Sequence, residues 1–323
     1  MRKTAGFALC FLFWPAAAQP GPSFDCAKST TPIEKAICAD SKLAAADREL
    51  ATVYGALLAT LGGAAKDHLA SDQVRWISYR DACAGDPDSC LPDRLQDRTD
   101  FLKQVSDGSY PFVSEHAIEQ HRKVKNITFT VDARYPQFDG PSVDFSAVNR
   151  KFADDAAKGA AELNRNTGVV VGTEQEWLYE QSFTLLRPSA NAVSVSVSSS
   201  IFAGGAHPNS GTEATLVDLR SGKALAPEDV FAPGEGWLKE MLRLVTADLQ
   251  RQFKERPGFD NALEPATLGK LLKEPGHYLY KKEHLKLTFN NYEVGPYVNG
   301  QYVVEIPYGK LRPLMRANGP LSP

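Results

Sequence analysis

Apolar positions in the first third of the chain recur every three or four residues, the spacing of one face of an α-helix. The clearest stripe consists of Leu43, Ala46, Leu50, Val53, Tyr54, Leu57 and Leu61, and Gly62 and Gly63 follow it. Two further helices are predicted over residues 66–82 and 92–105. A short helix is expected to begin at Pro32, with Thr31 as its N-cap. Together these elements predict a small helical domain over residues 24–106.

Beyond a linker predicted over residues 107–119, the pattern changes to a mixture of strand and helix spacing over residues 120–316. Strands are predicted at 124–135, 176–187, 191–200, 215–219, 223–225, 285–289 and 302–306, and helices at 148–163 and 238–253. In the strand over 191–200, valines alternate with serines, so one face is expected to be buried and the other small and polar. The grouping predicts an α+β fold, with an antiparallel sheet packed by two main helices.

Composition fits a soluble protein with a substantial core. The chain has 323 residues, of which 43% are hydrophobic and 23% are charged, and this excludes a largely disordered chain. The formal net charge of −3 leaves no basic field to hold nucleic acid. A mildly acidic protein suits a basic partner, and the same charge also serves solubility.

The first eighteen residues have the pattern of a signal peptide. Arg2 and Lys3 precede an apolar run from Ala5 to Trp14, and small residues up to Ala18 supply a cleavage site. The run is too short to span a bilayer, and no later segment reaches eighteen apolar residues. We therefore expect an exported protein, periplasmic or secreted, without a transmembrane segment after cleavage. The alternative is a short helix at the start of a cytosolic domain.

Four cysteines remain after this leader, and all of them lie in the first third of the chain. They are Cys26, Cys38, Cys83 and Cys90. An even number in one exported segment indicates two disulfides, and their spacing fits no zinc site. Three pairings are possible. Cys26–Cys38 and Cys83–Cys90 are favoured, because Gly85 and Pro87 break the helix between the second pair; free buried thiols are the alternative.

These residues carry a resemblance to a known family. The motifs are Phe24-Asp25-Cys26-Ala27-Lys28, Pro32 to Asp40, Ala46-Asp47-Arg48-Glu49-Leu50 and Gln73-x-x-Trp76-x-x-x-Arg80-Asp81-x-Cys83. Together they resemble the N-terminal domain of the LprI family of bacterial lysozyme inhibitors, and Cys90 is the expected fourth cysteine. The resemblance covers the whole first domain. It implies an exported bacterial protein whose partner is a lysozyme.

Motifs in the second domain carry a different resemblance. They are Phe202 to Asn209, Asp218-Leu219-x-x-Gly222-Lys223, Asp229-Val230-Phe231, Asn291 to Tyr297, and Val304 to Tyr308. They resemble the extracytoplasmic domain of RsiV, an anti-sigma factor that serves as a lysozyme receptor. The same domain accompanies the catalytic part of PdaC-type peptidoglycan deacetylases without performing the chemistry. Because this sequence has no sigma-binding segment, only ligand binding is carried over.

A search for catalytic motifs favours a protein that is not an enzyme. None of the common hydrolase, zinc-protease or phosphate-binding patterns is found, so no metal and no cofactor are predicted. His207, with Glu213 and Asp218 downstream, is the best hint of a catalytic or metal-binding group. We interpret His207 instead as a structural, hydrogen-bonding loop residue, and the alternative is a residue that contacts a partner. His277 and His284 are interpreted as incidental.

The favoured function is an exported envelope protein that binds, and inhibits, lysozyme or a related muramidase. The expected partner-binding residues are Gly204, Gly205, His207 and Asn209, with Tyr292 and Tyr297 in a second loop. A strand leads directly into the first loop, and its residues offer hydrogen bonds without negative charge. The alternatives are an accessory module that binds peptidoglycan or a cell-wall remodelling enzyme, and a hydrolase of unrecognised type.

Overall fold

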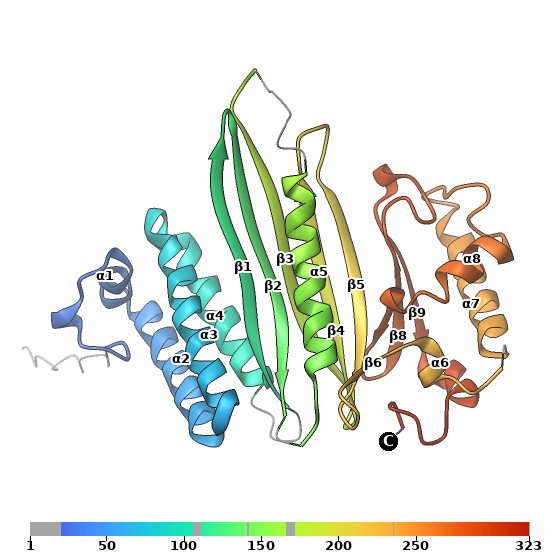
Figure 1. Cartoon of the computed structure of the whole chain (residues 1–323), viewed down its shortest axis with the longest axis horizontal. Coiled ribbons are helices and arrows are strands. Elements are labelled where there is room, and N and C mark those ends of the chain that lie inside the picture. Colours follow the sequence, from blue (N-terminus) through green and yellow to red (C-terminus); the bar gives the residue numbers. More distant parts are fainter. Residues whose placement is uncertain (1–20, 106–110, 141, 166–171, 235, 323) are drawn as a thin grey trace, which may run out of the picture. The chain divides into compact units, whose positions relative to one another are not determined.

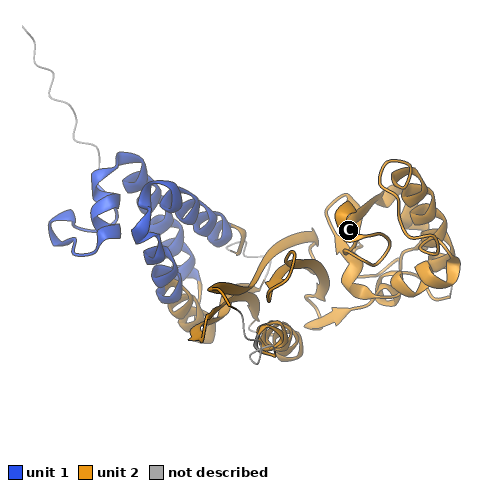
Figure 2. Ribbon diagram, turned by 90° about the horizontal axis from the view of Figure 1, so that it is seen from above, with its two compact units in different colours: residues 1–60, 74–103 blue, residues 61–73, 104–323 orange. Residues whose placement is uncertain are grey.

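A computed structural model describes residues 21–105, 111–140, 142–165, 172–234 and 236–322 (Figure 1). The predicted signal peptide lies outside these residues. By its internal contacts the chain divides into two compact units, which Figure 2 colours separately. One contains Met1–Thr60 and Val74–Lys103, and the other contains Leu61–Gln73 and Gln104–Pro323. We call them the helical unit and the α+β unit. The predicted α+β class is confirmed.

The helical region follows the predicted stripe closely. Its elements are η1 (Cys26–Lys28), α1 (Pro32–Ala39), α2 (Ser41–Thr60), α3 (Gly63–Asp81), η2 (Ala82–Gly85) and α4 (Pro87–Val105). The predicted cap of α1 is present: Thr31 Oγ1 accepts from Glu34 N at 3.1 Å, and Glu34 Oε2 accepts from Thr31 N at 3.0 Å. Helix α4 begins at Pro87, five residues earlier than expected, because proline needs no N–H in the first turn.

Both disulfides form in the favoured pairing. Cys26 is bonded to Cys38 and Cys83 to Cys90, with Cα atoms 5.9 Å and 5.6 Å apart. The first ties η1 to α1, and the second links η2 to the first turn of α4. Each closes a short stretch of chain within the helical unit, so neither one reaches the α+β unit.

The α+β unit is built on a six-stranded sheet, ordered β1-β2-β3-β4-β5-β6. The strands are β1 (Phe112–Val124), β2 (Ile127–Asp139), β3 (Gln175–Ser189), β4 (Ala192–Phe202), β5 (Asn209–Asp218) and β6 (Lys223–Leu225). Neighbours pair antiparallel except β2 with β3, which are parallel because α5 (Ser146–Asn164) carries the chain back between them. Helix α5 lies across one face of this sheet (Figure 1).

Strand β1 corrects the sequence analysis. Residues 112–119 were expected in the linker, yet they form the first part of this strand. The strand pairs along its whole length with β2 through a tight turn between Val124 and Ile127. It was missed because only its first three residues are buried and most of the others are polar, as on many edge strands.

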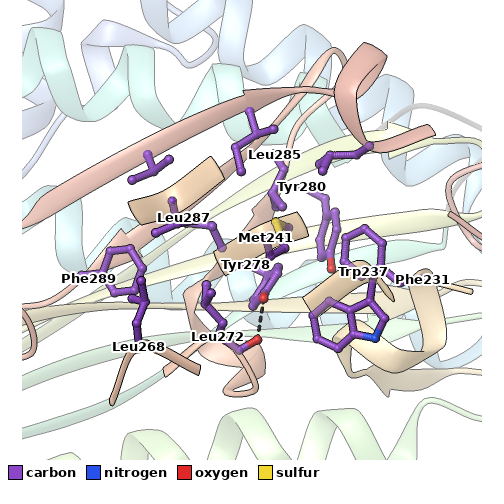
Figure 3. Packing of buried hydrophobic residues seen from close by; sticks show 14 of the residues in the cluster. Phe231, Trp237, Met241, Leu268, Leu272, Tyr278, Tyr280, Leu285, Leu287 and Phe289 are labelled. Atoms are coloured by element: carbon purple, nitrogen blue, oxygen red, sulfur yellow. Dashed lines mark hydrogen bonds between the residues drawn. The ribbon is translucent and has the colours of Figure 1, made fainter. Parts of the chain in front are cut away.

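A second, three-stranded sheet covers part of the first. It has the order β7-β8-β9, from β7 (Tyr278–Tyr280), β8 (His284–Phe289) and β9 (Tyr302–Pro307). Helices α6 (Pro227–Val230), α7 (Gly236–Gln252), α8 (Pro265–Leu271) and α9 (Tyr308–Leu311) accompany it. Figure 3 shows their shared core, where Tyr278 donates its hydroxyl to the carbonyl of Leu272 at 2.5 Å. Trp237 also lies in this core.

The valine–serine strand is buried on both faces over its first half. Ser194 and Ser196 are buried, as Val193 and Val195 are, because β7 packs on the serine side. Ser194 Oγ accepts a hydrogen bond from the backbone N–H of Tyr280 at 3.2 Å. Small hydroxyl side chains therefore allow the second sheet to approach closely and satisfy one of its backbone donors.

Candidate functional site

The first predicted loop connects β4 to β5 and turns through two glycines. Gly204 has φ +78° and Gly205 has φ +117°, values that favour glycine. Gly204 also lies against the buried indole of Trp177, and a Cβ there would come within 3.3 Å of the ring. The buried ring of Trp177 therefore packs beneath this turn. Beyond it the loop is exposed from Gly205 to Ser210.

The second predicted loop connects β8 to β9 and is stabilised from within. Tyr292 has φ +71°, unusual for a residue with a side chain, and its N–H donates to the carbonyl of Gly295 at 3.1 Å. Gly295 permits close packing, because a Cβ there would lie 2.7 Å from the ring of Tyr302. Tyr292 is 55% exposed and Val298 86% exposed, so the tip presents apolar surface to solvent.

The structure brings these two loops together, which the sequence could not establish. The ring of His207 stacks on that of Tyr297, with centroids 3.7 Å apart and planes inclined by 18°. Tyr297 donates its hydroxyl to the carbonyl of Pro208 at 2.8 Å, and His207 Nδ1 lies 2.9 Å from the same oxygen. We call residues 203–211 and 290–300 the paired loops.

These contacts fix the hydrogen-bonding character of His207. A carbonyl oxygen only accepts, so the hydrogen of the ring resides on Nδ1 when Nδ1 contacts Pro208. The neutral ring then leaves Nε2 as an acceptor. Asn209 is exposed beside it and begins β5, where its backbone pairs with Ile201. The paired loops therefore offer one ring acceptor and one side-chain amide on a rigid base.

Asn290 joins the paired loops to the larger sheet, a role that the sequence analysis missed. Its Oδ1 accepts from Thr212 N at 2.8 Å and its Nδ2 donates to Thr212 O at 3.1 Å, so the side-chain amide imitates a neighbouring strand. Gln301 Nε2 donates to the same Oδ1 at 2.8 Å. The only sequence signal was a polar amide at the end of an apolar strand.

His277 supports the second loop from below and is not incidental. It is buried, with Nε2 3.0 Å from Glu293 Oε2 and Nδ1 3.3 Å from the carbonyl of Glu274. Glu293 Oε2 also accepts from Asn290 N at 2.6 Å. Burial alone lowers the pKa of His277, but the hydrogen bond and charge of Glu293, with the contribution of Glu274, outweigh it and raise that pKa. The pair holds the start of the loop in place.

A groove of about 360 Å³ opens beside the paired loops, between α5 and strands β3 to β5. Asn290 and Gly211 line it, so the groove and the paired loops share residues. Lys151 crosses it, with Nζ 2.7 Å from Asp155 and 3.3 Å from Glu213. Hydroxyl, amide and aromatic side chains supply much of the remaining lining: Phe152, Tyr179, Gln181, Ser199, Thr212 and Thr215.

The alternative constellation around His207 does not assemble. Asp218 lies at the opposite end of β5 from the His207 loop and accepts hydrogen bonds from Arg220 and Ser221 in the next turn. Glu213 is paired with Lys151. Within the described ranges, His, Cys, Asp and Glu side chains do not gather in groups of three or more that would hold a metal ion. Among those residues, too, helices long and apolar enough to cross a bilayer are absent.

In the helical unit, several residues of the quoted motifs maintain the fold, whereas Asp25 and Lys28 of the first motif are exposed. Asp47 is buried and its Oδ2 accepts from Ser23 N at 2.7 Å. Trp76 lies in the core, with the guanidinium groups of Arg80 and Arg98 each 5.9 Å from its ring centroid. These motif side chains face inward. They define a scaffold and do not by themselves mark a binding surface.

Two family models match separate stretches of the chain. The fold consists of a disulfide-bonded helical unit and an α+β unit. Residues 26–102 match the family model "Lysozyme inhibitor LprI". Residues 228–309 match the family model "Protein of unknown function (DUF3298)". The chain thus carries an LprI lysozyme inhibitor domain and a DUF3298 domain. No curated protein matches the chain.

Two solved structures are similar to this chain. One is a DUF3298 family protein from Pseudomonas aeruginosa PAO1, with 17% sequence identity, coverage of 66% of this chain and 97% of that one, and a TM-score of 0.48. The other is a DUF3298 family member from Bacteroides fragilis, with 14% identity, coverage of 64% and 95%, and a TM-score of 0.41.

Proposed function

We propose that this protein is an exported bacterial envelope protein that binds and inhibits lysozyme or a related muramidase. The match of residues 26–102 to the LprI lysozyme inhibitors carries the proposal, because it supports lysozyme inhibition at the level of the family. The two disulfides fit an extracytoplasmic protein. A periplasmic or secreted location and removal of residues 1–18 are part of the proposal.

The proposed docking surface is the pair of loops in the α+β unit. The loops are exposed and also rigid, which supports this proposal. The stacked His207 and Tyr297 rings and the hydrogen bonds of Asn290 to Thr212 fix the loop conformation before a partner binds. A preformed surface loses little conformational entropy on binding. Tyr292 and Val298 add exposed apolar area, which commonly anchors protein interfaces. The resemblance of residues 120–316 to the RsiV lysozyme receptor also belongs to this proposal.

The chemistry of a muramidase cleft suits these groups. Glycosidases of this type use two carboxyl groups, one of them protonated to act as the general acid. The Nε2 acceptor of neutral His207 would accept the hydrogen of the acid, and the Asn209 amide would donate to the ionised partner. Such a loop inhibits by occupying the cleft, so the inhibitor needs no catalytic group of its own.

The experiment uses the intact oxidised chain and lysozymes of different structural classes. We expect saturable binding by calorimetry to at least one class, and slower clearing of a cell-wall suspension in proportion to the complex formed. Binding without slower clearing would show that the protein binds lysozyme as a receptor does but does not inhibit it. Absence of both effects at ten-micromolar concentrations of each lysozyme would contradict the proposal.

The groove beside the paired loops favours a second candidate, an accessory module that binds peptidoglycan. Hydroxyl, amide and aromatic side chains of the kind that line it also recognise sugars and short peptides. Co-sedimentation with purified sacculi, with and without lysozyme, separates the candidates. Sedimentation without any lysozyme binding would support the accessory module.

A further inference from the structure

A second cavity lies on the α+β unit, where the last described residues fold back against the ends of β3 and α6. Its volume is about 380 Å³, within the range of small-molecule sites. Thirteen described residues line it, and none of them lines the groove beside α5 or belongs to the paired loops. An inference about this cavity is therefore independent of lysozyme binding.

The charged residues that line this cavity are all cationic. They are Lys282, from the turn between β7 and β8, with Arg312 and Arg316 near the end of the described chain. Lys282 and Arg312 have no side-chain hydrogen bond or ion pair within the described part of the chain. Arg316 donates from Nε and Nη2 to the carbonyl of Glu228 at 3.2 Å and 2.8 Å, an uncharged acceptor that does not neutralise it.

Acidic residues occur nearby in sequence, but they do not line the cavity. Glu228 and Asp229 are exposed on α6, where Asp229 Oδ2 accepts from Ala226 N at 2.9 Å. Glu283 is also exposed, and its backbone carbonyl accepts from Tyr308 N at 3.2 Å. Three positive charges therefore converge on one cavity in a chain whose net charge is −3.

The other walls are largely apolar and are held in place. Val230, Met315 and Leu321 line the cavity together with the Tyr308 ring, whose hydroxyl donates to the carbonyl of Lys281 at 2.9 Å. The terminal stretch is fixed by a hydrogen bond from Arg316 N to the carbonyl of Val230 at 2.9 Å. The site is thus preformed, with an apolar interior beside its cations.

We propose that this cavity binds a small amphiphilic anion: a single alkyl chain that ends in a carboxylate or a phosphate. The alkyl chain occupies the space between Val230, Met315 and Leu321 and loses its contact with water. The anionic group lies among Lys282, Arg312 and Arg316, where guanidinium groups suit the planar geometry of carboxylate and phosphate oxygens.

The test titrates the intact chain with decanoate and with decyl phosphate, each below its micellar concentration, by calorimetry. Both should bind with Kd values at least tenfold lower than those of acetate, inorganic phosphate and uncharged decanol. Added salt should weaken binding severalfold, because the recognising charges are exposed. Inorganic phosphate that binds as tightly as decyl phosphate would overturn the proposal. Binding to anionic phospholipid vesicles, but to neither monomeric probe, would also overturn it.

Matched variants locate the binding. Lys282→Gln with Arg312→Gln removes two exposed, unpaired cations, so the melting temperature should stay the same while affinity for decanoate falls at least tenfold. Lys239→Gln with Lys270→Gln removes two exposed cations elsewhere in the same unit and should leave affinity unchanged. Leu321→Gln should lower affinity for decanoate and leave any acetate binding unaltered. Equal affinities in the first two double variants would refute the assignment.

Discussion

The two regions of this molecule present their conspicuous residues in opposite ways. In the helical unit Asp47 and Trp76 are buried and the cysteines are bonded to one another, although Asp25 and Lys28 of the first motif are exposed. In the α+β unit His207 and Tyr292 are exposed on loops that buried residues hold from beneath. A recognisable sequence signature therefore marks a scaffold in one region and a surface in the other. The family that suggests a function matches the first region, whereas the best-formed surface lies in the second.

The largest effect should follow removal of the disulfides. Cys→Ser at all four mature positions, or full reduction, should unfold the helical unit and leave the α+β unit folded, because both bonds lie within the helical unit. Each short loop closure contributes on the order of 3 kcal/mol in the chain-entropy model. Circular dichroism melts with and without reductant measure this. An unchanged helical melting transition in fully reduced protein would contradict the prediction.

A smaller loss of stability should follow Asn290→Ala. The change leaves the N–H and carbonyl of Thr212 without their side-chain partner, which costs about 1–3 kcal/mol when such groups are shielded from water. The melting transition of the α+β unit should fall while that of the helical unit stays constant. If the paired loops are the docking surface, lysozyme affinity should fall as well. If the melting temperature of the α+β unit matched that of the wild type, Asn290 would not stabilise the loops.

Substitution at the loop surface should affect binding and spare stability. His207→Ala with Asn209→Ala should weaken lysozyme binding by about 1–3 kcal/mol and leave the melting temperature nearly unchanged, because both side chains are exposed. Gln250→Ala with Asn261→Ala, two exposed polar residues elsewhere in the unit, is the matched control. The opposite pattern, lower stability with affinity retained, would assign the two residues to the fold alone.

The smallest effect should be a pH dependence of the α+β unit. The folded-state pKa of His277 is raised, so its pairing with Glu293 stabilises the fold fully below the unfolded pKa of about 6.5 and is lost as pH rises through the folded value. Melting temperatures across this window should therefore fall with pH more steeply in wild type than in His277→Gln. Parallel profiles for the two proteins would exclude His277 as the titrating group.

Periodicity in the sequence was enough for the long helices and for most strands, but the short helices α6, α8 and α9 were not predicted. The stripe from Leu43 to Leu57 and the cap at Thr31 were predicted where they occur. Strand β1 and the three-residue strand β7 were missed, since one is largely polar and the other is too short to show a period. The single sheet that was predicted is in fact two, because nothing local shows that the serine side of β4 faces Tyr280.

The residues of the proposed docking loops could be singled out one by one in the sequence, but their assembly could not be predicted. These residues carry polar and glycine signals that were visible in the sequence. The stacking of His207 on Tyr297 joins positions ninety residues apart, and such a contact has no local signature. His277 and Asn290 escaped notice for a related reason: their roles consist of bonds to distant backbone and carboxylate groups.

The single parallel strand pair has a consequence for how the larger sheet assembles. Val124 and Ile127 pair across a separation of three residues, whereas Ile127 pairs with Gln175 across 48. Four doublings of separation cost roughly 2.4 kcal/mol of additional loop-closure free energy. We therefore expect the hairpins to form early and the β2–β3 seam, closed through α5, to form late. In pulse-labelling hydrogen exchange during refolding, the β2 amides that face β3 should become protected later than those of the β1–β2 hairpin. Earlier protection of the β2–β3 amides would contradict this order.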